Sequence, residues 1–104
     1  MVRGATPTHV IRVKDGEGEY VNFTDATAIS VTYKQDDLME MTKTMEDGVS
    51  VTDEGHVKVQ LTKSDTMSLF PGICRVQIEA DFGGNVVISD AGKIKVENRL
   101  KSGE

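Results

Sequence analysis

The stretch from Val57 to Val96 reads VKVQLTKSDTMSLFPGICRVQIEADFGGNVVISDAGKIKV. Apolar residues alternate with polar ones from Val57 to Leu61, and the same period of two returns from Cys74 to Phe82. This spacing predicts strands with one face buried and the other in water. Cys74 lies in the apolar row, so we expect a buried structural thiol rather than a nucleophile.

Two local signals predict how these strands are connected. Thr62 and Asp65 have the spacing of an acidic capping box, in which the Thr62 side chain caps the Asp65 amide and the carboxylate reaches back. Pro71-Gly72 then ends this single helical turn, before a strand that starts near Ile73. Gly83-Gly84 can take the positive φ angles of a type I′ turn, so the following strand is expected to fold straight back.

The rest of the chain shows the same kind of pattern. It predicts strands over His9–Val13, Ala28–Lys34, Leu38–Met45 and Val49–Thr52, with Tyr20–Thr24 as either a short strand or an extended loop. Seven to eight short antiparallel strands with a turn about every 8–12 residues are typical of an all-β sandwich. We expect one domain, divided into an N-terminal arm (1–8), a β-sandwich (9–98) and a polar C-terminal tail (99–104).

Charge and composition exclude several classes of function. A net charge of −5 disfavours a general nucleic-acid binder, which needs a basic face to displace counterions from phosphate. The single cysteine rules out an internal disulfide and fits folding in a reducing cytoplasm. No apolar run of about 18 residues exists and the amino terminus does not resemble a signal peptide, so we expect no membrane contact and no export by that route.

None of the candidate metal-binding residues has the spacing of a known site. His9 and His56 lie 47 positions apart (56 − 9) without the Cys/His spacing of a zinc site. Asp36-Asp37 and Asp53-Glu54 lack the alternating array of a calcium loop, so solvated turns are the better interpretation.

The remaining candidates are also explained by structure rather than chemistry. Gly83-Gly84 lacks the Lys-Ser or Lys-Thr that follows in a phosphate loop. Met39, Met41 and Met45 could form an adaptable binding face, but core filling is the more common use of methionine. We therefore predict a non-enzymatic protein with no catalytic, cofactor-binding or metal-binding residues, and the residues that bind a partner stay open.

Three motifs follow one another along the chain in a familiar order. They are Thr6-Pro7-Thr8-His9, Val31-Thr32-Tyr33-Lys34-Gln35 and Leu61-Thr62-Lys63-Ser64-Asp65-Thr66. In this order the chain resembles small structural proteins of phages and prophages of Gram-positive bacteria, and it is similar to the amino-terminal β-sandwich domain of phage baseplate upper proteins. It departs from the family pattern at Asp15–Thr24 and at Glu79, which leaves the partner-binding surface open.

The resemblance implies an immunoglobulin-like sandwich in the tail or baseplate of a virion, made in the cytoplasm of the host bacterium. Its partners would be other virion proteins or a second copy of itself, contacted through an edge strand or through the arm before His9. A receptor- or carbohydrate-binding module that uses loops of the sandwich is the alternative, weakened by the presence of only five aromatic residues. The resemblance carries no functional residue over to this chain.

Overall fold

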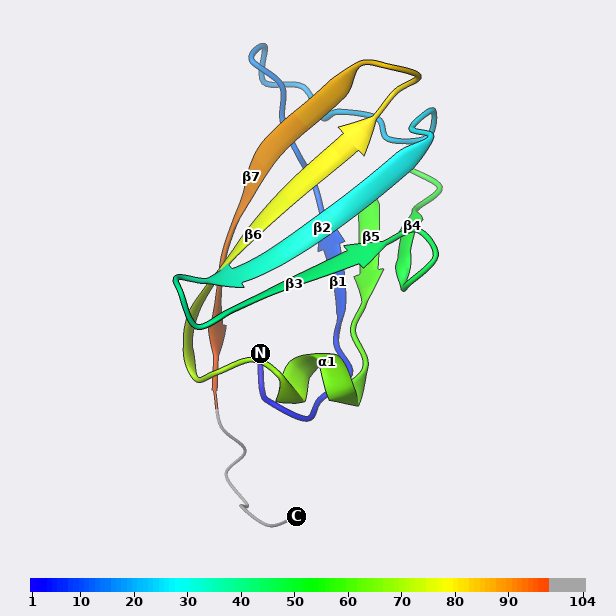
Figure 1. Cartoon of the computed structure of the whole chain (residues 1–104). Coiled ribbons are helices and arrows are strands. Elements are labelled where there is room, and N and C mark those ends of the chain that lie inside the picture. The colour runs from blue at the N-terminus through cyan, green and yellow to red at the C-terminus, as the bar shows by residue number, and fades with distance from the viewer. Residues whose placement is uncertain (98–104) are drawn as a thin grey trace.

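The computed structural model describes residues 1–97, which contain seven strands and one short helix (Figure 1). In chain order the elements are β1 (Thr8–Ile11), β2 (Ala28–Gln35), β3 (Met39–Thr44), β4 (Val49–Val51), β5 (Val57–Gln60), α1 (Lys63–Met67), β6 (Gly72–Asp81) and β7 (Val86–Val96). The all-β prediction is confirmed, and the helix lies where the capping box placed it. The predicted tail, 99–104, lies outside the described residues.

The larger sheet has four antiparallel strands in the order β3-β2-β6-β7. Its inner face is built from alternate residues of the two central strands, β2 and β6. These residues are Ile29, Val31, Tyr33, Cys74, Val76, Ile78 and Ala80, and each has at most 3% of its surface exposed. The predicted facing of Cys74 is therefore confirmed, and Arg75 and Gln77 lie on the exposed face.

The smaller sheet has three antiparallel strands in the order β1-β5-β4. Its central strand, β5, buries Val57 and Val59 completely, while Lys58 and Gln60 point to solvent. The strand β1 runs from Thr8 to Ile11, one to two residues earlier than the predicted His9–Val13.

Both sheets contribute to one core, which is mostly aliphatic. Among residues 1–97, the aromatic members of the buried cluster are Phe23 and Tyr33, with Phe82 packed partly buried against it, in agreement with the low aromatic content. Phe23 belongs to the segment Tyr20–Thr24, which forms no strand and is therefore the extended loop of the two predicted alternatives. A buried ring lets this loop close one side of the core although its backbone pairs with neither sheet over a full strand.

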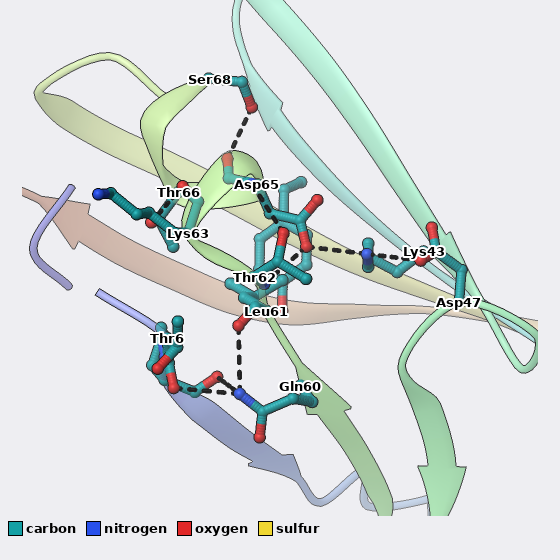
Figure 2. Close-up of polar contacts among 12 residues, drawn as sticks. Thr6, Lys43, Asp47, Gln60, Leu61, Thr62, Lys63, Asp65, Thr66 and Ser68 are labelled. Carbon is teal, nitrogen blue, oxygen red and sulfur yellow. Dashed lines mark hydrogen bonds and ion pairs between the residues drawn. The ribbon is translucent and has the colours of Figure 1, made fainter. Parts of the chain in front are cut away.

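The helix α1 connects the two sheets, and its capping box is formed (Figure 2). The Thr62 hydroxyl accepts from the Asp65 amide at 3.1 Å, and the Asp65 carboxylate accepts from the Thr62 amide at 2.8 Å. These bonds satisfy two of the amides that a helix start leaves without partners. After the helix, Leu69 is fully buried and leads the chain toward β6.

Gln35 is the last residue of β2 rather than part of the following turn. Its side chain is 3% exposed and forms reciprocal hydrogen bonds with the backbone of Phe70: Nε2 donates to the carbonyl at 2.7 Å, and Oε1 accepts from the amide at 2.8 Å. Because both the donor and the acceptor of this buried side-chain amide are hydrogen-bonded, neither is left buried without a partner, which would be unfavourable. The turn itself begins at Asp36, whose φ is 47°.

The N-terminal arm is bound to the rest of the domain, although the sequence predicts that it lies outside the core. The Glu97 amide donates to the Met1 carbonyl at 2.8 Å and the Arg3 amide donates to the Glu97 carbonyl at 2.9 Å, so the arm pairs in parallel with the end of β7. The buried Thr66 hydroxyl then accepts from the Gly4 amide at 2.9 Å and donates to the Ala5 carbonyl at 2.8 Å. Figure 1 shows the arm passing beside α1.

Candidate interaction surface

The histidines that the sequence singled out have different neighbours. Nδ1 of His9 lies 3.1 Å from the Tyr33 hydroxyl, in the space between the sheets, whereas the ring of His56 meets Tyr20 edge-on. Burial, with a smaller effect from the positive amino terminus, lowers the pKa of His9. Within residues 1–97 no group of three or more His, Cys, Asp or Glu residues is placed to hold a metal ion.

The structure also locates the other predicted positions. Burial raises the pKa of the Cys74 thiol. Met39 and Met41 pack against the core, as predicted, whereas Met45 is 41% exposed. Gly83 and Gly84 take φ angles of 73° and 111° in the β6–β7 turn, as the hairpin prediction requires.

A buried ion pair joins the sheet to the helix, and sequence reasoning missed it. Lys43 on β3 is 3% exposed, and its ammonium donates to Asp65 at 2.8 Å and to Asp47 at 2.9 Å (Figure 2). Burial opposes the charge on both groups, but the hydrogen bonds outweigh it and raise the pKa of Lys43 while lowering the pKa of Asp65. In the sequence, Lys43 continues the alternate positions of Met39 and Met41, and this spacing could have indicated that Lys43 faces the core. The network orders α1 against β3 and is structural.

The most exposed apolar stretch of a strand lies at the start of β7. Val86, Val87 and Ile88 are 55%, 38% and 60% exposed, and uncharged Asn85 and Ser89 flank them. Val86 and Ile88 lie opposite Asp81 and Glu79 on the outer face, while Val87 lies opposite the buried Ala80 on the inner face. We call residues 85–89 the β7 edge segment.

The exposure of Val87 has a geometric cause. The strands of the smaller sheet have 4, 3 and 4 residues, whereas β6 and β7 have 10 and 11. At about 3.3 Å per residue, the smaller sheet covers roughly 13 Å of strands that are about 33 Å long. The larger sheet therefore extends past the strands of the smaller one (Figure 1). Beyond them its inner face is covered by the loop through Phe23, which packs on Phe82 and leaves Ala80 buried, whereas Val87 on the edge strand stays 38% exposed.

The outer face beside this segment is hollowed and acidic. A shallow groove of about 510 Å³ lies between Val86 and the β3 end, and the charged side chains that line it are Glu46, Glu79 and Asp81. Met45 and Val86, both exposed, supply part of its apolar surface. Such a groove can contact the side chains of a bound segment.

Comparison with known proteins does not identify a family. No protein-family model matches the chain, and neither the curated proteins nor the solved structures give a match. In the part of the chain that the structure describes, no helix is long and apolar enough to cross a membrane.

Proposed function

We propose that the protein is a non-enzymatic structural component of a phage virion, in the tail or baseplate, whose β-sandwich mediates contacts between proteins. The observation that carries this proposal is the order of the three motifs at Thr6–His9, Val31–Gln35 and Leu61–Thr66. Two antiparallel sheets around one aliphatic core agree with that class of protein, as does a long strand edge with exposed apolar residues.

We further propose that the sandwich is immunoglobulin-like, and the strand order supports this. Immunoglobulin variable domains pair strands B, E and D in one sheet and G, F, C and C′ in the other. The orders β1-β5-β4 and β7-β6-β2-β3 agree with these if β1 corresponds to B and β7 to G. The arm that pairs in parallel with the end of β7 then takes the place of a short first strand.

A polar contact in the core supports the same proposal. True immunoglobulin domains join strands B and F by a disulfide that packs on a Trp of strand C. The corresponding strands here supply His9, Cys74 and Tyr33, with a hydrogen bond between His9 and Tyr33 at 3.1 Å. Burial, followed by the charges of Cys74 and Asp65, raises the pKa of the Tyr33 hydroxyl, which stays protonated and can donate to the imidazole.

The proposed function is tested on virus particles. The phage, or an induced lysogen that carries the gene, is purified by density gradient, and the chain is quantified by mass spectrometry in whole particles and in separated tails. We expect a fixed copy number in the tail fraction, with an abundant host cytoplasmic protein as the control for contamination. Abundance in the lysate combined with absence from particles would reject the proposal. Binding to a glycan array would then favour the carbohydrate-binding alternative.

A further inference from the structure

The free edge of β7 presents unpaired backbone groups at known positions. The Phe82 amide donates to the Asn85 carbonyl across the hairpin at 2.8 Å, so these two residues form a hydrogen-bonded pair. Hydrogen-bonded and non-hydrogen-bonded pairs alternate along antiparallel strands. The next hydrogen-bonded pair is therefore Ala80 and Val87. The amides and carbonyls of Val86 and Ile88 therefore point away from β6, toward the open side of the sheet.

Only part of this edge is open. Toward its end, β7 pairs with the protein's own arm through Glu97, and the register shifts between Val76 and Gln77, where Gly92 lies opposite Val76. Bulges of this kind bend a strand and interrupt pairing. The β7 edge segment lies before the bulge, on the side of the β6–β7 turn, whereas the arm pairs after it. Three successive β-branched residues, of which the first and third have open backbone groups, are the kind of edge to which another strand adds.

The sequence of the segment is complementary to itself. If a second copy pairs antiparallel about a two-fold axis through Val87, each Val86 lies opposite Ile88 of the other copy, and the two Val87 residues face each other. This register places the outward-pointing backbone groups of Val86 and Ile88 in two hydrogen-bonded pairs, as antiparallel geometry requires. Asn85 then lies opposite Ser89 and Asp90 opposite Gly84, so no charged residue faces a like charge.

The acidic side chains tolerate this arrangement. Glu79 and Asp81 lie on β6, one strand inside the edge, so those of the two copies are separated by three strand spacings, about 14 Å. That exceeds the screening length of about 8 Å at physiological salt. Axes through Val86 or Ile88 also satisfy the hydrogen-bond pattern, but they place Ile88 opposite Gly84 or Val86 opposite Asp90 and lose apolar contacts.

We propose that two copies of this protein associate through the β7 edge segment, so that their larger sheets join into one continuous antiparallel sheet. This inference concerns the chain alone and does not depend on a place in a virion. Because the segment is short, the interface falls in the small, weak class, and association is expected at concentrations between about 10 μM and 1 mM.

The test is sedimentation velocity of the full chain over that range of concentration, with three variants. Ile88→Lys places a charge in the proposed interface, whereas Leu38→Lys adds the same charge at an apolar residue that is 65% exposed in the β2–β3 turn. Ile88→Pro removes an amide that points to the open edge and makes no bond to β6. We expect the wild type and Leu38→Lys to dimerise alike, and both Ile88 variants to weaken the dimer at least tenfold.

Hydrogen exchange on the same samples locates the contact. In the wild type, the amides of Val86 and Ile88 should gain protection as the protein concentration rises. Thermal unfolding curves of the variants show that each variant remains folded. A wild-type chain that stays monomeric at about 1 mM overturns the proposal. Equal dimerisation of Ile88→Lys and Leu38→Lys overturns it as well, because the two copies would then meet through another surface.

Discussion

Replacing Asp65 by alanine tests how α1 is held against the larger sheet. The carboxylate accepts from the Thr62 amide and from the Lys43 ammonium, both at 2.8 Å. Loss of the capping bond from the Thr62 amide lowers the free energy of unfolding by about 1 kcal/mol. Leaving a buried charge without its partner costs about 3–5 kcal/mol, and the lower end applies because Asp47 still contacts Lys43. We expect Asp65→Ala to lower the free energy of unfolding by about 3–4 kcal/mol.

The partner substitution should cost less. Lys43→Met leaves the Asp65 carboxylate without its cation, but this carboxylate is 18% exposed and keeps the bond from the Thr62 amide, so we expect a loss of about 1–2 kcal/mol. In the Lys43→Met background, Asp65→Ala then loses only its share of the cap, about 1 kcal/mol. The coupling energy between the two positions is thus about 2–3 kcal/mol. Asp47→Ala removes the other partner, which is 63% exposed, and should cost less than about 1 kcal/mol.

Urea unfolding at pH 7 measures all four changes. With a slope of about 1–3 kcal/mol per molar, the loss in Asp65→Ala corresponds to a midpoint lower by about 1–4 M. The reasoning is refuted if Asp65→Ala costs the same in the wild-type and Lys43→Met backgrounds, because Asp65 would then stabilise the helix alone. A large loss for Asp47→Ala would show that the exposed carboxylate carries the interaction.

Three further predictions follow from single residues. The pKa of Asp65 is lowered from 3.8, so its contribution is complete above that pH and is lost as the pH falls through the folded-state value; the urea midpoints of wild type and Asp65→Asn should converge only below pH 3.8. Cys74 has no exposed surface and a raised pKa, so a thiol reagent should label it only after denaturant unfolds the protein; stoichiometric labelling within seconds in native buffer would contradict its facing. Thr66→Val keeps the shape of the side chain but leaves the Gly4 amide and the Ala5 carbonyl without these bonds, so the free energy of unfolding should fall by about 1–3 kcal/mol; an unchanged free energy would mean that the arm does not contribute to stability.

The features that were predicted correctly depend on residues close together in the sequence. The burial of Cys74 follows from an alternation over nine residues, the cap from a spacing of three between Thr62 and Asp65, and the β6–β7 hairpin from two glycines. Each of these signals specifies a local backbone conformation or which side chains of one strand share a face. Neither property depends on which strand lies next to it.

The features that were missed depend on contacts between distant segments. Lys43 and Asp65 are 22 residues apart, and Gln35 and Phe70 are 35 apart, so their pairing requires the final packing of α1 and β6 against β2 and β3. The arm was expected to be separate because Met1–Thr8 shows no alternation. It is bound instead by backbone hydrogen bonds to Glu97 and by the hydroxyl of Thr66, and neither depends on an apolar pattern.

The bound arm also changes where a partner strand can add. The sequence predicted docking through an edge strand or through the arm before His9. The arm is paired with the end of β7, and the edge strand β1 offers only four residues. A longer open edge exists on β7 because the larger sheet extends past the smaller one, which leaves Val87 without a facing strand. Val86, Val87 and Ile88 on this edge are 55%, 38% and 60% exposed. In the dimer that we propose, the register about Val87 adds the strand of a second copy beside them and reduces that exposure.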